Sequence, residues 1–170
     1  MDKVQRILNF AMRMEKDAAD FYSYYMDKVS SPATRELFHE LVETEKQHYG
    51  FLKNKYDELG FSEPPLVISW VVDSNFAAKD PHILSINSEV AGDPDVEVSD
   101  LSIIRMAFLI ESDFAEFYKN AIEVVVEPDA KNLLKTLADW EEQHKKMFQE
   151  KYQKLIKKYW SDISSIVFPE

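Results

Sequence analysis

The chain has 170 residues, of which 45% are hydrophobic and 30% charged, so it can bury the core of one domain. Its formal net charge of −11 argues against a nucleic-acid partner, because a phosphate backbone would repel it. The sequence contains no cysteine, which excludes disulfides, thiolate metal sites and cysteine nucleophiles. No apolar run reaches the roughly 18–20 residues of a membrane span, and residues 1–6 do not open a signal peptide. We therefore expect a cytoplasmic protein with no membrane partner.

The proline positions indicate where long helices can form, because proline is not tolerated in a helix interior. The long proline-free windows are 1–31, 33–63, 95–127 and 129–168. We predict helices A and B within 1–60, a crossover at 61–100, helices C and D within 101–160, and a tail at 161–170. Two helical hairpins joined by one long connection predict an all-α, ferritin-like four-helix bundle that forms a single domain over 1–170.

The two halves of the chain repeat each other. When residues 7–59 are laid over 103–155 without gaps, 17 of the 53 positions are identical. Background composition would give about 3 identities. The identical pairs include Pro32 and Pro128, each of which precedes a periodic apolar run and suits the first position of a helix. We infer an internal duplication, so a feature that occurs in both halves carries more weight than one that occurs once.

Acidic and histidine side chains lie on the apolar stripe of the second helix in each half. At 100° per residue, Glu45 and His48 fall inside this stripe in the first half, as do Glu141 and His144 in the second. The apolar members of the stripe are Leu37, Leu41 and Leu52 in one half and Leu133, Leu137 and Phe148 in the other. The same pattern in both repeats predicts that these acids and histidines point into the bundle interior.

The first helix of each half adds one more acid to this interior, Glu15 in one repeat and Glu111 in the other. Burying an ionised carboxylate without compensation costs several kcal/mol, and four together also repel one another. The stripes carry no lysine or arginine, whereas two divalent cations would balance four glutamates and two neutral histidines. Oxygen and imidazole ligands suit iron or manganese, with zinc possible. The sequence therefore predicts two metal ions per chain.

Two other features could be mistaken for ligands. Glu36 and His39 have the same three-residue spacing, but His39 lies about 180° round the helix from His48. Their repeat counterparts are Asn132 and Lys135, so this pair is not duplicated. We expect Glu36 and His39 to lie on the surface. We also expect His82, in the crossover, to have no metal role.

Tyr22 and Tyr118 each follow their interior glutamate by two helical turns, on the same face. One interpretation is that they are ordinary core aromatics with a satisfied hydroxyl. The other is that each hydroxyl reaches a ligand carboxylate on a neighbouring helix and supports it. The sequence leaves both open, and both can be true.

Four segments in order resemble the rubrerythrin branch of the ferritin-like di-iron-carboxylate proteins. They are MEKDAADFY at 14–22, EKQH at 45–48, ESDFAEFY at 111–118 and EEQH at 141–144. By this resemblance, Glu15 and Glu111 would be the metal ligands of helices A and C. Glu45 with His48, and Glu141 with His144, would be those of helices B and D. The resemblance covers about 110 residues in two blocks.

The resemblance implies a di-iron oxidoreductase that reacts with peroxide or oxygen and takes electrons from a separate donor protein. It also implies a homo-oligomer, most simply a dimer. Family members usually carry a further glutamate one turn after the helix C ligand, where this chain has Phe114. Two other functions therefore stay open: iron oxidation or storage without peroxidase turnover, and a metal retained for stability alone.

Overall fold

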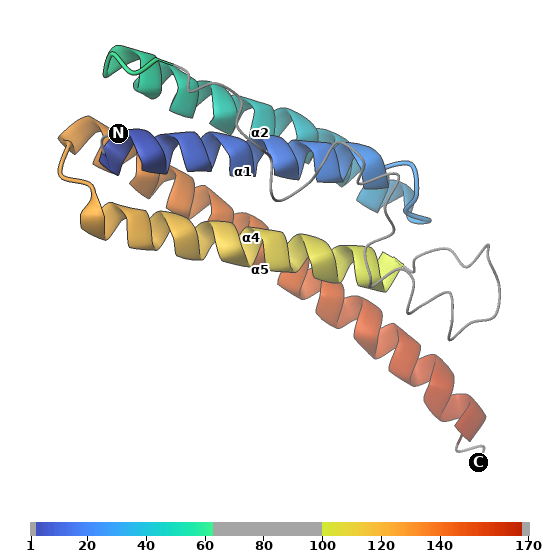
Figure 1. Ribbon diagram of the computed structural model, residues 1–170. Helices are drawn as coiled ribbons and strands as arrows, with labels where there is room; N and C mark the ends of the chain where they lie inside the picture. Colours follow the sequence, from blue (N-terminus) through green and yellow to red (C-terminus); the bar gives the residue numbers. More distant parts are fainter. Residues whose placement is uncertain (1–2, 63–99, 168–170) are drawn as a thin grey trace, which may run out of the picture. The chain divides into compact units, whose positions relative to one another are not determined.

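The computed structural model describes residues 3–62 and 100–167, which fold into four helices (Figure 1). In chain order these helices are α1 (Lys3–Tyr25), α2 (Pro32–Glu58), α4 (Asp100–Val124) and α5 (Pro128–Val167). The described residues contain no strand, so the prediction of an all-α protein is confirmed. The predicted crossover, with His82, falls almost wholly within 63–99 and lies outside the described residues.

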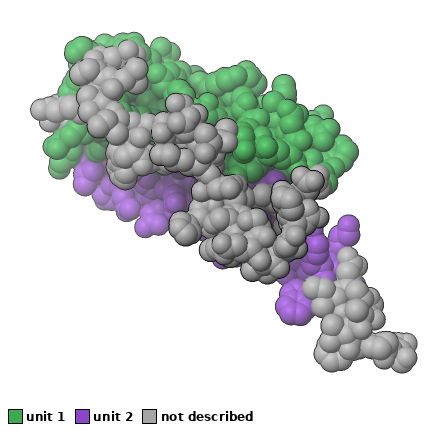
Figure 2. All heavy atoms as spheres, turned by 45° about the vertical axis from the view of Figure 1, so that its right-hand side comes forward, with its two compact units in different colours: residues 1–99 green, residues 100–170 purple. Residues whose placement is uncertain are grey.

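The chain divides into two compact units, residues 1–99 and 100–170 (Figure 2). In unit 1, α1 packs against α2, and in unit 2, α4 packs against α5. The helices of each unit run antiparallel and are joined by a short connection, so each unit is a helical hairpin (Figure 1). The two predicted hairpins are therefore present, while the single domain over 1–170 stays a prediction.

The second helix of each hairpin begins at a proline, as the sequence predicted. Before Pro32, the Ser31 side chain accepts a hydrogen bond from the backbone N–H of Thr34, at 3.3 Å. Before Pro128, the Glu127 carboxylate accepts hydrogen bonds from the backbone N–H groups of the residues that follow Pro128. A side-chain oxygen at this position satisfies N–H groups that have no partner within the helix. These caps fix where α2 and α5 start.

The last helix is longer than the sequence analysis predicted. We predicted that helix D ends at 160 and that 161–170 forms a tail, but α5 continues to Val167. The reason is local, because no proline or glycine interrupts the chain between Pro128 and Pro169. Residues 168–170 of the predicted tail lie outside the described residues.

The hydrophobic core of each hairpin is rotated slightly from the predicted stripe. At the start of α2, Phe38 is fully buried and Leu37 only half-buried. In α5, Leu134 is fully buried and Leu133 half-buried. Neighbouring residues differ by 100° on a helix, so a small rotation exchanges which of them faces the core. In unit 1 the exchange lets the Phe38 ring pack on Tyr22, at 5.1 Å between ring centroids.

The cap of α2 gives a test of this local structure. We expect Ser31→Ala to lower the free energy of unfolding by about 1 kcal/mol, because the N–H of Thr34 loses its acceptor. Chemical denaturation monitored by circular dichroism measures the change. Ser23→Ala, on an exposed position inside α1, is the control and should leave stability equal or slightly higher. Equal stability of the Ser31 variant and the wild type would contradict the role assigned to the cap.

Candidate metal centre

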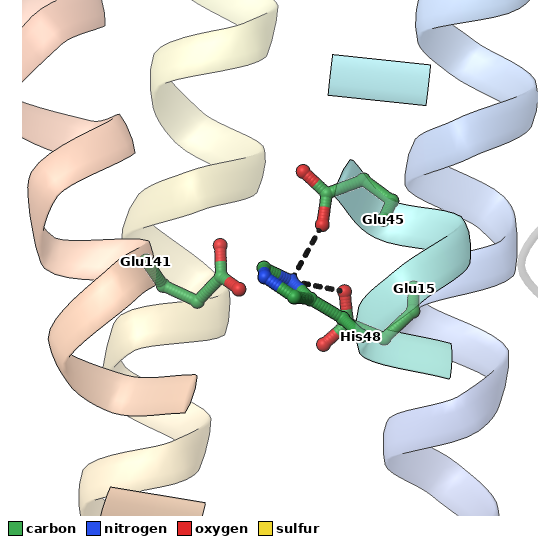
Figure 3. Close-up of side chains that lie close together, drawn as sticks. All are labelled: Glu15, Glu45, His48 and Glu141. Carbon is green, nitrogen blue, oxygen red and sulfur yellow. Dashed lines mark ion pairs between the residues drawn. The ribbon is translucent and has the colours of Figure 1, made fainter. Parts of the chain in front are cut away.

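The first half-site lies inside unit 1, where α1 contributes Glu15 and α2 contributes Glu45 and His48 (Figure 3). The His48 Nδ1 atom lies 2.9 Å from Glu45 Oε2 and 3.4 Å from Glu15 Oε2. One ligand atom from each of the three residues falls within 4.8 Å of the others. All three side chains are buried. An acid from one helix thus meets an acid and an imidazole from the next.

The second half-site, inside unit 2, repeats this arrangement. Here α4 contributes Glu111 and α5 contributes Glu141 and His144. The His144 Nδ1 atom lies 3.3 Å from Glu141 Oε2 and 3.4 Å from Glu111 Oε2. Both carboxylates are fully buried. The two hairpins therefore place the same three residue types in the same geometry.

Helix geometry explains how each half-site forms. Residues three apart on a helix project side by side, so Glu45 stands next to His48 and Glu141 next to His144. The glutamate of the first helix reaches them because the two helices pack against each other. Carboxylate oxygens and imidazole nitrogens at this spacing can hold a divalent metal ion. The six residues that the sequence singled out thus form two groups of three.

Burial and proximity shift the proton affinities of the second half-site. Burial raises the pKa of Glu111 to about 8, although the hydrogen bond from His144 works against this rise. Burial lowers the pKa of His144, but Glu111 and Glu141 outweigh it and raise this pKa to about 10. Protons therefore stay on these groups at neutral pH in the metal-free protein. A metal ion that binds here must displace them.

The two half-sites differ in exposure. The His48 side chain is 3% exposed, whereas the His144 side chain is 18% exposed. The duplicated ligands therefore lie in unequal surroundings in the two hairpins.

The two tyrosines expected near the ligands, Tyr22 and Tyr118, are fully buried. Tyr22 packs edge-on against Phe21, with ring centroids 5.4 Å apart, and Tyr118 packs in the same way against Phe117. Their aromatic role in the core is thus plain. Contact between each hydroxyl and a ligand carboxylate stays a prediction.

The pair with the misleading spacing lies on the surface. Glu36 and His39 are both exposed on α2, as the absence of a repeat counterpart suggested. Phe114, where the resemblance implied a further glutamate, is buried in α4. The ligand geometry of unit 2 is therefore built without a fourth acid at that position.

Sequence reasoning missed a pocket that adjoins the first half-site. This pocket, of about 390 Å³, lies in unit 1 and reaches two of the three ligands. It is lined by Glu15, Lys16, Ala19, Asp20, Glu45, Lys46 and Tyr49. The pocket residues other than the two glutamates carried no signal in the sequence, because a pocket depends on which side chains of two helices face each other.

Comparison with known proteins gives a family and a fold. The family model described as Rubrerythrin matches residues 6–152. No curated protein matches the chain. The helices in residues 3–62 and 100–167 include none that is long and apolar enough to cross a membrane.

Three solved structures illustrate the fold similarity. A hypothetical protein from Pyrococcus furiosus has a TM-score of 0.67 and 22% identity, with 91% of each chain covered. A two-domain protein from Anabaena variabilis, with DJ-1/ThiJ/PfpI-like and ferritin-like domains, has a TM-score of 0.66 and 18% identity, covering 91% of this chain and 37% of that one. CopM in its Cu(I)-bound form has a TM-score of 0.65 and 14% identity, covering 91% and 99%. The predicted class, an all-α ferritin-like four-helix bundle, is confirmed.

The raised pKa values predict that the metal-free protein loses stability as pH rises. Glu111 binds its proton more tightly when folded, so its contribution is complete below the usual pKa of 4.5 and lost as pH rises through about 8. The contribution of His144 is lost in the same direction, as pH rises from 6.5 through about 10. Denaturation in chelator from pH 6 to pH 9 measures the loss.

Glu111→Gln cannot titrate at this position, so we expect it to flatten the pH dependence of unfolding. Glu36→Gln is the control, because Glu36 is a glutamate on an exposed position of α2. It should keep the wild-type slope. The same slope in all three proteins would contradict the assignment of the proton to the buried pair.

Proposed function

Because the chain belongs to the rubrerythrin family, we propose that its two half-sites act together as one centre for two metal ions. The ligands are Glu15, Glu45, His48, Glu111, Glu141 and His144. In this proposal the metal is iron, and the protein is an oxidoreductase that reacts with peroxide or oxygen. The observation that carries the proposal is the repeated group of two buried glutamates and one histidine in each hairpin.

Charge balance supports two divalent ions. Each half-site buries two carboxylates, which are costly to keep ionised in a low-dielectric interior. Two half-sites with neutral imidazoles carry four negative charges, which two divalent cations neutralise. Metal-free protein can compensate only by holding protons, as the raised pKa values of Glu111 and His144 indicate. Metal and protons therefore compete for the same residues.

Ligand chemistry supports iron, with manganese and zinc as the alternatives. The six ligands offer carboxylate oxygen and imidazole nitrogen, and the chain has no cysteine to supply thiolate. CopM, with which this chain shares the fold, is described in Ag-, Cu(II)- and Cu(I)-bound forms. Copper and silver therefore belong in the metal analysis, although thiolate and thioether ligands are what select Cu(I).

Bound iron would supply the electrons for reduction of peroxide or oxygen, as ferrous iron becomes ferric. The chain's own part is to fix the ligands, to balance charge and to keep the centre inside a helical core. Tyr22 and Tyr118 would hold ligand carboxylates in place through their hydroxyls. The 170 residues contain no thiolate centre that could relay electrons, so we include an external donor protein, a cytoplasmic setting and a homodimer in the proposal.

Iron oxidation or storage is the second candidate, and Phe114 favours it. The resemblance implied a further glutamate at this position, and a buried phenylalanine offers no ligand atom there. A centre with six protein ligands could oxidise iron without peroxidase turnover. The two candidates share the same ligands. They differ in that the oxidoreductase would consume peroxide or oxygen repeatedly, whereas the storage protein would accumulate ferric iron.

Metal content tests the ligand assignment. We expect about two metal ions per chain in protein purified without chelator, and fewer in Glu45→Ala or His144→Ala. Each variant removes a ligand and leaves the remaining carboxylates under-compensated. Elemental analysis beside circular dichroism separates lost metal from lost fold. Glu36→Ala and His39→Ala are the matched controls, and unchanged metal in all four variants would contradict the site.

Redox behaviour tests the function. We expect the ferrous protein to consume hydrogen peroxide rapidly in stopped flow, and to do so repeatedly when a reductant is added. His144→Ala should lose this turnover because a ligand is missing, while His39→Ala should keep it. Accumulation of ferric iron far above two ions per chain, without peroxide turnover, would instead establish iron storage.

A further inference from the structure

The pocket in unit 1 borders two ligands of the first half-site. Its floor includes Glu15 and Glu45, which are fully buried, while Lys16 and Asp20 at its rim have side chains about two-thirds exposed. A volume of about 390 Å³ is far larger than a hydrated metal ion needs. The cavity between α1 and α2 thus has an exposed rim and lies next to two ligands that are themselves shielded from solvent.

We propose that this α1/α2 pocket is the entrance through which divalent metal ions reach the centre. The inference rests on the proposed function, because it assumes that Glu15 and Glu45 bind metal. Beyond the proposed function, the inference adds a route for the metal ions and assigns three rim residues to it. These residues are not metal ligands; they are Lys16, Asp20 and Lys46. The proposed route runs through the α1/α2 side of unit 1.

The rim of the pocket is not bridged from one helix to the other by its lysines. Lys16 pairs with Asp20 on the same helix, at 2.7 Å, and Lys46 pairs with Glu43 on its own helix, at 2.8 Å. Both pairs are well exposed, so each holds its lysine only weakly. Each lysine therefore pairs along its own helix and not across the pocket.

The equivalent surface of unit 2 is bridged. Lys119 of α4 donates a hydrogen bond to Glu142 of α5 at 2.6 Å, and Lys145 lies 3.7 Å from the same carboxylate. Under the 96-residue repeat, Lys119 corresponds to Ser23 and Glu142 to Lys46. Ser23 and Lys46 cannot form such an ion pair. The repeat therefore carries a cross-helix bridge in one hairpin and an open pocket in the other.

The charge of the pocket suits a cation. Its lining contains three acids, Glu15, Asp20 and Glu45, against two lysines. The whole chain carries a formal net charge of −11, which raises the local concentration of cations near the surface. A metal ion is thus attracted toward the rim and then toward the deeper pair of glutamates.

Reversible blocking of the rim tests the entrance. The chain has no cysteine, so Lys46→Cys gives a single thiol that a bulky aromatic methanethiosulfonate labels and a phosphine reductant releases. Cobalt(II) uptake by the metal-free protein is followed by its visible absorption in stopped flow. We expect the label to slow uptake at least about tenfold, an added barrier of about 1.4 kcal/mol. Release of the label should restore the rate.

Glu142→Cys, at the repeat-equivalent position of unit 2, is the matched control and should load cobalt equally fast with and without the label. A second pair, Tyr49→Cys and its repeat mate Lys145→Cys, repeats the comparison if Lys46→Cys folds poorly. Equal uptake rates for labelled and unlabelled Lys46→Cys, with full final cobalt content, would overturn the entrance alone. Failure of the wild type to bind cobalt would overturn the proposed metal centre as well.

Discussion

Buried negative charge is the constraint on which this molecule depends. Each hairpin contributes two glutamates that are fully shielded from water, beside apolar and aromatic core side chains. Such an interior tolerates carboxylates only when positive charge or a proton accompanies them. In unit 2 the raised pKa values of Glu111 and His144 show protons in this role. The fold thus maintains a group of residues that is unfavourable alone and favourable once compensated.

Much of the fold could be predicted because its signals are local or repeated. Pro32 and Pro128 mark helix starts by their own chemistry, and the 96-residue repeat fixes two hairpins of matching length. Two details were wrong. The end of α5 was placed too early, although no helix-breaking residue stands there. The exchange of Leu37 for Phe38 in the core depends on how two helices rotate against each other, which periodicity alone does not determine.

The ligand groups could be predicted because duplication separated them from chance. Glu45 with His48 recurs as Glu141 with His144, whereas Glu36 with His39 does not recur and lies on the surface. The surroundings could not be predicted in this way. The ion pair between Lys119 and Glu142 joins residues 23 positions apart on different helices, and only packing brings them together. Repeats therefore reveal ligands well and access routes poorly.

The unequal helices of unit 2 have a consequence for local opening. With 40 residues, α5 rises about 60 Å, whereas the 25 residues of α4 rise about 38 Å. Among the described residues, Leu101 near the start of α4 still lines a hollow with Trp160, and α5 continues past it (Figure 1). Amide hydrogens in these final turns have no second helix of their own hairpin to shield them. These amide hydrogens will exchange with solvent faster than those around Glu141. Protection from hydrogen exchange therefore decreases along α5 toward its C-terminal end.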